Sequence, residues 1–139
     1  KIAQTMAGQI ALSVSTPSQY AALAAFSGPQ DCIKEYMAIY AERREIMMGT
    51  LQRLGFKTYG GHGGYLMLVD IESGQSVLQA DEFCIELLRQ TGLRCSPSQY
   101  PAYTKFVNMS WLQPTDMIAE AFDKFERFVL DLQSKSAKL

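Results

Sequence analysis

The chain has 139 residues, which is enough for one compact domain and too few for two ordinary ones. Hydrophobic residues make up 47% and charged residues 19%, a balance that excludes disordered, collagen-like and low-complexity classes. The formal net charge is -1 and no run of basic residues occurs, so we expect no nucleic-acid partner.

Two features of the sequence indicate where in the cell the protein is located. The three cysteines, Cys32, Cys84 and Cys95, are widely spaced without a C-x-x-C motif, which predicts reduced thiols in a cytoplasmic protein. Residues 2–30 carry no charge, but Gln, Ser and Thr interrupt every apolar run, so we expect neither a membrane span nor a signal peptide. Because the chain does not begin with Met, we expect it to be a piece of a longer protein.

The first part of the chain is predicted to be helical. Residues 18–27 form an Ala-rich segment, with Pro17 suited to a first turn and Gly28 after its end. Apolar residues then recur at three, four or seven positions, which predicts one long helix over residues 30–54. At 1.5 Å per residue this helix would measure roughly 37 Å, a length typical of helices that join two lobes.

The second part alternates between strands and helices. Short strands are predicted at 56–59 and 93–96, and longer ones at 65–71 and 105–111. The apolar run 65–71 (YLMLVDI) predicts a strand buried on both faces. Helices are predicted over 81–90, with Leu87 and Leu88 in its inner stripe, and from near Pro114 to about residue 132. A Pro-rich turn is expected at 97–101.

These elements predict a mixed α/β fold of the α+β layered type. We expect the segments 65–71, 93–96 and 105–111 to share one sheet, covered by helices over 80–91 and 115–132, because the apolar stripes have no other surface to bury against.

No catalytic set is complete by spacing alone. The glycine cluster 60–64 is interpreted as a flexible turn rather than an anion-binding loop, and His62 within it as a solvated residue without metal-ligand partners. Asp81 and Glu82 suit the first turn of a helix and Glu86 its solvent side. The remaining assignments are an exposed charged face at 42–45, core roles for Met47 and Met48, and two loop aromatics, Tyr100 and Tyr103.

Several short motifs in a fixed order resemble the later half of class I/II aminotransferases, the fold-type I enzymes that use pyridoxal 5'-phosphate (PLP). Order and spacing agree from residue 2 to about residue 132. The motifs are 15–22 (STPSQYAA), Tyr40 with Arg43 and Arg44, 54–56 (LGF), 63–66 (GGYL), 69–71 (VDI), 81–84 (DEFC) with Leu87 and Leu88, 91–93 (TGL), 96–97 (SP), 107–110 (VNMS) and Glu120 with Ala121.

The resemblance implies a carboxyl-terminal fragment. Residues 1–28 would end the large cofactor domain, 29–55 would form an interdomain helix, and 56–139 would form the small carboxyl-terminal domain. In the family the Schiff-base lysine lies upstream, and Lys1 is too close to Gln19 to be that residue. We therefore expect no catalytic and no cofactor-binding residue in this chain, and no PLP bound to it. Four lysines are expected on surfaces: Lys34, Lys57, Lys105 and Lys124.

One position departs from the family pattern. Where the family usually has an arginine that holds the substrate α-carboxylate, this chain has Asn108, which the resemblance makes its one candidate substrate-binding residue. Lys105 lies three residues away along a strand, so it would point to the opposite face and is no obvious substitute.

Three functional interpretations stay open. The first is part of an aminotransferase, acting on an amino acid and a 2-oxo acid as a homodimer. The second is a non-catalytic scaffold or ligand-binding protein of the same fold that has lost the carboxylate arginine, and the third is an unrelated α+β binding module. If the chain is a fragment, residues 2–28 lack their usual packing partner, and we expect them to pack against their own small domain or another chain.

Overall fold

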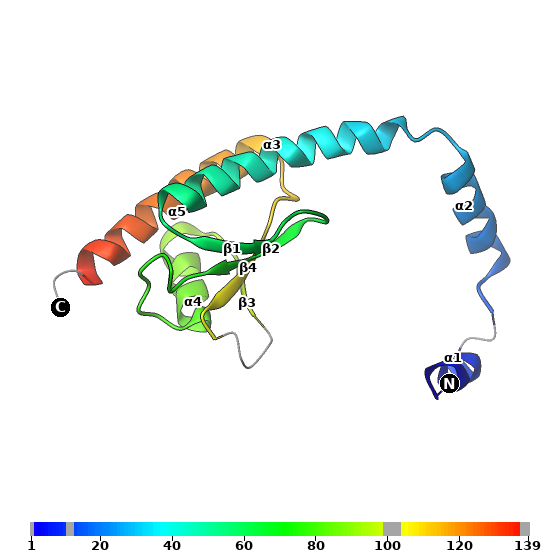
Figure 1. Ribbon diagram of the computed structural model, residues 1–139, viewed down its shortest axis with the longest axis horizontal. Helices are drawn as coiled ribbons and strands as arrows, with labels where there is room; N and C mark the ends of the chain where they lie inside the picture. Colours follow the sequence, from blue (N-terminus) through cyan, green and yellow to red (C-terminus); the bar gives the residue numbers. More distant parts are fainter. Residues whose placement is uncertain (1, 11–12, 99–103, 137–139) are drawn as a thin grey trace. The chain divides into compact units, whose positions relative to one another are not determined.

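The computed structural model describes residues 2–10, 13–98 and 104–136. Its elements are α1 (Ile2–Ile10), α2 (Thr16–Ser27), α3 (Asp31–Arg53), β1 (Lys57–Gly60), β2 (Leu66–Asp70), α4 (Ala80–Thr91), β3 (Ser96–Pro97), β4 (Phe106–Ser110) and α5 (Thr115–Ser136) (Figure 1). The chain divides into two compact units, Lys1–Glu35 and Tyr36–Leu139. None of the described helices is both long enough and apolar enough to cross a membrane.

The first unit holds α1, α2 and the first turn of α3. α1 lies where the sequence predicts no helix, because residues 2–10 offer no charged or capping residue to mark its ends. α2 begins two residues before its predicted start, since the Ser15 side chain accepts a hydrogen bond from the Ser18 backbone N–H and Pro17 fits the first turn. The Gly28 backbone N–H donates to the carbonyl of Ala24 and closes the helix.

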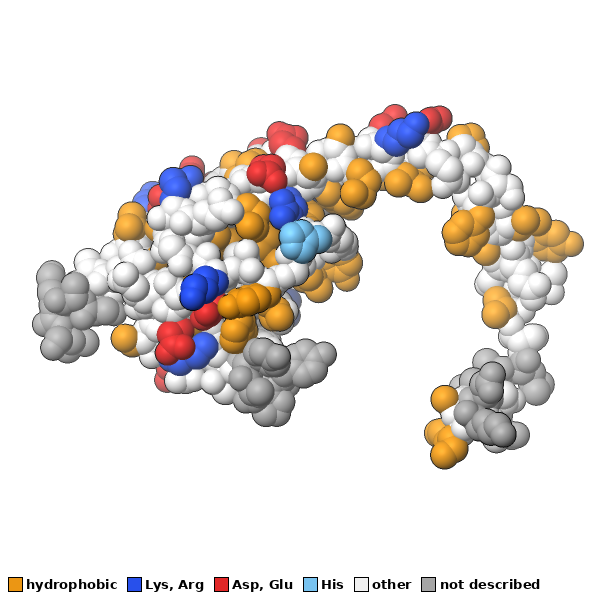
Figure 2. Space-filling view, viewed as in Figure 1, with side chains coloured by type: hydrophobic (Ala, Val, Ile, Leu, Met, Phe, Trp, Pro, Cys, Tyr) orange, Lys and Arg blue, Asp and Glu red, His pale blue; other side chains and the backbone are white. Residues whose placement is uncertain are grey.

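The apolar side chains of α2 are open to solvent (Figure 2). The helix has no buried residue, and Phe26 is 87% exposed. The packing of residues 2–28 against their own small domain or against another chain stays a prediction.

The second unit is built on a four-stranded antiparallel sheet in the order β1-β2-β4-β3. The prediction that segments within 65–71, 93–96 and 105–111 share a sheet is confirmed. Every buried strand side chain lies on one face, where Met67 and Val69 of β2 meet Val107 and Met109 of β4 across the register. The fold is thus mixed α/β, with helices layered on a small sheet.

β2 differs from its prediction because it is buried on one face only. Val69 is fully buried, whereas Leu66 is 47% exposed on the opposite face. The antiparallel sheet has helices on one side, so the continuous apolar run of β2 supplies a core face and an uncovered face.

β3 is also shorter than predicted. Only Ser96 and Pro97 pair with β4, and Leu93 to Cys95 lie outside the ladder. Pro97 has no N–H to donate, which suits a short strand at the sheet edge.

α3 and α5 lie alongside one another in the same direction. Near the start of α5, the Arg43 guanidinium donates to the Thr115 hydroxyl at 3.3 Å. Ten residues further along α3, Arg53 forms an ion pair with Glu126 of α5 at 2.8 Å. The prediction of a solvated charged face at 42–45 is wrong for Arg43 and Arg44, which are half-buried and hold loops. Met47 is a core residue, as predicted.

α4 contributes Phe83, Cys84 and Leu87 to the core. The Phe83 ring contacts the rings of Phe125 and Phe128 of α5 edge-on. Leu88 was placed in this inner stripe and is instead 49% exposed, because the buried stripe follows Phe83, Cys84 and Leu87 and leaves Leu88 on the outer side. The first-turn assignment of Glu82 is confirmed, since its carboxylate accepts from the Gln79 backbone N–H at 3.0 Å.

Candidate functional site

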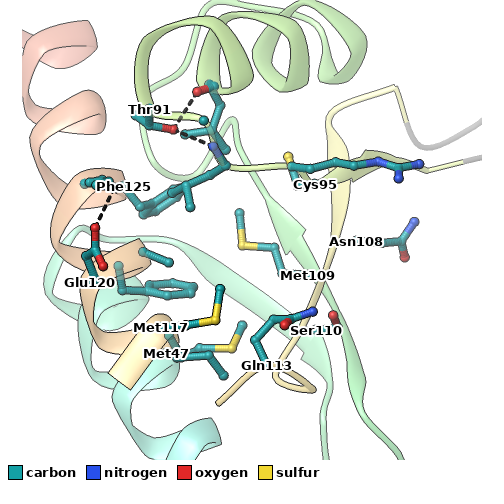
Figure 3. A pocket seen from close by; sticks show the side chains of 18 of the residues that line it. Met47, Thr91, Cys95, Asn108, Met109, Ser110, Gln113, Met117, Glu120 and Phe125 are labelled. Carbon is teal, nitrogen blue, oxygen red and sulfur yellow. Dashed lines mark hydrogen bonds and ion pairs between the residues drawn. The ribbon is translucent and has the colours of Figure 1, made fainter. Parts of the chain in front are cut away.

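Asn108 lies in the middle of β4, on the sheet face that α3, α4 and α5 leave uncovered. It faces Leu68 of β2 on one side and Ser96 of β3 on the other. Its half-buried amide donates a long hydrogen bond, 3.5 Å, to the carbonyl of Pro97. Figure 3 shows that Asn108 and the neighbouring Met109 point to opposite sides of the strand. The amide therefore has donor capacity left for a bound group.

The sheet face around Asn108 is mainly apolar. In register with Asn108 lie Leu68 and, beyond it, Tyr59 of β1. The Tyr59 ring contacts Phe106 edge-on at a centroid distance of 5.7 Å. An uncovered apolar face with one central amide is suited to binding, whereas proton transfer would need a titratable group beside it.

A cavity of about 620 Å³ opens beside β4, between this strand and the first half of α5 (Figure 3). Met47, Met109, Met117 and Phe125 supply apolar lining, and Asn108 lies among the polar lining residues. The cavity thus offers a methionine-rich surface of the kind that adapts to varied apolar shapes, on the side of β4 opposite to the Asn108 amide.

The charged pair at this cavity is already satisfied. The Lys124 ammonium contacts the Glu120 carboxylate at 2.7 Å, and this hydrogen bond and charge lower the pKa of Glu120. These two side chains are therefore ion-pair partners of each other one turn apart on α5.

Arg94 is a cation that the sequence analysis did not consider. It lines the same cavity as Asn108, is exposed, and makes no hydrogen bond or ion pair within the described part of the chain. It stands two positions before Ser96, the cross-strand neighbour of Asn108. In an extended segment, residues 94 and 96 point to the same face, and this alternation is the sequence signal that could have indicated Arg94 as a site residue.

The glycine cluster 60–64 forms the turn between β1 and β2, and its flexibility stays a prediction. Gly60, Gly61 and Gly64 adopt left-handed conformations, and the Arg44 guanidinium donates to the Gly61 carbonyl at 2.7 Å. His62 is exposed on this loop (Figure 2). Over residues 2–10, 13–98 and 104–136 no three potential metal ligands cluster. Tyr100 and Tyr103 lie outside the described residues.

The candidate lysines are scattered. Lys34 and Lys57 are exposed, and Lys105 donates to the carbonyl of Leu78 at 3.2 Å, so it is engaged away from Asn108. Lys105 and Lys124 are half-buried, and each contacts a neighbouring acceptor.

Comparison with known proteins gives the family. Residues 1–125 match the family Aminotransferase class I and II. An aspartate aminotransferase of Bacillus sp. (strain YM-2) is 30% identical over 119 residues, which is 83% of this chain and 30% of that protein. An LL-diaminopimelate aminotransferase of Desulforudis audaxviator is 29% identical over 108 residues, which is 76% of this chain and 27% of that protein.

Solved structures agree with this assignment. The alanine aminotransferase from Pyrococcus furiosus superposes with a TM-score of 0.77 at 30% identity, over 88% of this chain and 32% of that one. An aminotransferase from Mycobacterium tuberculosis has the same fold, with a TM-score of 0.80 at 23% identity, over 91% of this chain and 34% of that one. The chain belongs to the class I and II aminotransferases, and it spans about a third of the length of the relatives it matches.

The family implies PLP, and the described residues do not fit that group on their own. A PLP site needs a free amine and donors for a phosphate. Here the cavity lysine, Lys124, is paired with Glu120, and within residues 2–10, 13–98 and 104–136 no glycine-rich loop leads into a helix N-terminus. No step through PLP is therefore assigned to the side chains of this chain.

Proposed function

We propose that the chain is the carboxyl-terminal part of an aminotransferase that transfers an amino group between an amino acid and a 2-oxo acid. The support is the family match over residues 1–125, together with relatives that are aspartate and LL-diaminopimelate aminotransferases. In this proposal PLP and its Schiff-base lysine belong to the remainder of the protein, which acts in the cytoplasm as a homodimer.

The proposal gives each part of the chain a place in that protein. Residues 1–28 end the cofactor domain, residues 29–55 connect the domains, and residues 56–139 form the small domain. The exposed apolar side chains of α2 support this arrangement, because a helix with no buried residue has its natural contacts elsewhere.

Asn108 is proposed to bind the substrate α-carboxylate. The observation that carries this role is its position on the uncovered sheet face, between Leu68 and Ser96, with its amide only weakly engaged by Pro97. An amide offers a carboxylate ordinary hydrogen bonds, whereas a guanidinium offers two charge-assisted ones. Arg94, which lines the same cavity without a described partner, is proposed to supply the missing positive charge.

The second candidate function is a non-catalytic ligand-binding protein of the same fold. The specific observation in its favour is again Asn108, because an uncharged residue there removes the strongest contact with an amino-acid substrate. Under this proposal the apolar cavity beside β4 would still bind small molecules, without amino transfer.

An assay of the complete protein separates the two candidates. The protein, loaded with PLP, is incubated with L-amino acids and 2-oxoglutarate, and formation of the new 2-oxo acid is measured. Amino transfer supports the aminotransferase. Binding of an amino acid, measured by calorimetry, with no transfer supports the non-catalytic protein and overturns the first proposal.

A further inference from the structure

Two cysteines that are eleven positions apart in the sequence meet in the folded chain. The Sγ atoms of Cys84, in α4, and Cys95, just before β3, lie 3.1 Å apart. Both are free thiols, and this contact was not expected from their wide spacing in the sequence. The main-chain turn that follows α4 brings the two residues together.

The turn after α4 brings Cys95 back beside Cys84. Gly92 adopts the left-handed conformation, φ 77°, and its N–H donates to the Leu88 carbonyl at 2.9 Å. The Thr91 hydroxyl donates to the Leu87 carbonyl at 2.6 Å and accepts from the Leu93 N–H at 3.1 Å. These bonds reverse the chain within a few residues, and Cys84 is anchored from the other side by its place in the core.

The surroundings of the two sulfurs suit a reactive pair. Cys84 is 8% exposed, and half-buried Cys95 lines the open cavity beside β4, which gives a small oxidant a route to the pair. The hydrogen bond from Cys95 lowers the pKa of Cys84, against the opposing effects of burial and of Asp81. The same bond and burial raise the pKa of Cys95, so Cys84 is the sulfur that more readily becomes a thiolate.

We propose that Cys84 and Cys95 form a redox-sensitive dithiol that a hydroperoxide converts to an intrachain disulfide. The Sγ atoms need to approach by only about 1 Å to reach bonding distance. In the described part of the chain no third ligand accompanies them, which argues against a metal role for the pair.

The reaction balances with hydrogen peroxide as the oxidant. The Cys84 thiolate attacks one peroxide oxygen, so that an S–O bond forms and the O–O bond breaks, and the departing hydroxide becomes water with the proton that Cys84 released when it ionised. Cys95 then gives up its proton and attacks the Cys84 sulfur, which forms the S–S bond and releases a second water. The two sulfurs together lose two electrons, and the peroxide gains them.

The disulfide would fasten α4, at Cys84, to the residue that precedes β3. Ser96 follows Cys95 and pairs with Asn108, so the oxidised form would link α4 to the edge of the sheet. This inference concerns the fold of the chain and does not rest on the proposed aminotransferase function.

Peptide mapping of the full 139-residue chain tests the inference. Cys32→Ser removes the third, exposed thiol and leaves the core untouched. This variant is treated with hydrogen peroxide, blocked with an alkylating reagent and digested with trypsin. Cleavage after Arg89 and Arg94 separates Cys84, in peptide 58–89, from Cys95, in peptide 95–105. The expected product is one species in which these peptides are joined by a disulfide within one chain rather than between two chains, and dithiothreitol should release them.

Further readouts make the result decisive. The oxidised Cys32→Ser chain should melt at least about 5 °C higher than the reduced one, because the bond restricts the unfolded chain. Cys84→Ser and Cys95→Ser, made in the Cys32→Ser background, should give no joined peptide and no rise. If the folded Cys32→Ser chain yields only alkylated, sulfinic or intermolecularly linked cysteines at peroxide excess, the proposal is wrong. That conclusion does not depend on whether the variants of buried Cys84 fold.

Discussion

The ring of Phe56 lies directly against the backbone of Gly74, so closely that a Cβ on Gly74 would stand 2.3 Å from Cε1 of the ring. Phe56 is a core residue and contacts Phe125 at a centroid distance of 5.7 Å. The turn that follows β2 therefore packs directly on the core. A side chain at Gly74 can be accommodated only if the Phe56 ring moves.

Gly74→Ala is expected to destabilise the chain. The added methyl must displace the Phe56 ring from a packed core, which costs about 1–3 kcal/mol in the free energy of unfolding. Urea denaturation followed by circular dichroism measures this. Gly63→Ala is the matched control, since a Cβ there meets nothing within 4 Å, and its change should stay within about 0.5 kcal/mol. Equal stability of the two variants would contradict the packing seen at Phe56.

The chain is expected to self-associate through the first unit. α2 leaves Leu23 and Phe26 exposed, and contiguous apolar surface of this kind promotes association. The double variant Leu23→Lys with Phe26→Lys should shift the sedimentation profile toward monomer at the same protein concentration. Ser27→Lys, an exposed position on the same helix, controls for the added charge. A parent chain that stays monomeric at every concentration would count against this prediction.

The isolated chain is expected not to form a covalent adduct with PLP. Among the described lysines, Lys105, Lys124 and Lys135 are engaged by neighbouring oxygens, and Lys34 and Lys57 are exposed. After incubation with PLP and reduction with borohydride, peptide mass spectrometry should show at most scattered, substoichiometric labelling. A stoichiometric adduct at one lysine would overturn the expectation.

Most of the elements could be predicted from the sequence because their signals are local. The periodicity of α5 and the capping residues of α2 and α4 depend on neighbours within a few positions. The two faces of β2 could not be separated, because an apolar run does not tell which side the helices cover. Contacts between distant segments were missed for the same reason, as with Arg44 and Gly61 or with Cys84 and Cys95.

Only one residue of the candidate site could be predicted from the sequence. Asn108 was found by its place in a motif, and β4 puts it on the uncovered sheet face. Arg94 has no motif, so its link to Asn108 required the pairing of β3 with β4, which covers only two residues. The family of the chain could be inferred because many short motifs occur in one order.

Arg94→Ala is expected to weaken substrate binding by the complete, PLP-loaded protein. Loss of a charge-assisted hydrogen bond to a carboxylate is worth about 1.5–3 kcal/mol, or roughly 10- to 150-fold in KM for the amino acid. Arg94→Lys should recover part of this loss. Arg89→Ala removes an exposed arginine that pairs with Glu86 at 2.9 Å and should leave KM unchanged. Equal KM values for the Arg94→Ala and Arg89→Ala proteins would show that Arg94 does not contact the substrate.

Asn108→Arg in the complete protein tests the central claim most directly, that this strand position faces the substrate carboxylate. A guanidinium there adds charge-assisted hydrogen bonds worth on the order of 2–4 kcal/mol, so the dissociation constant of the amino acid should fall by roughly 30- to 1000-fold. Titration calorimetry measures the constant, and circular dichroism confirms that the variant is folded. A folded Asn108→Arg protein whose affinity for amino acids is unchanged would contradict the account.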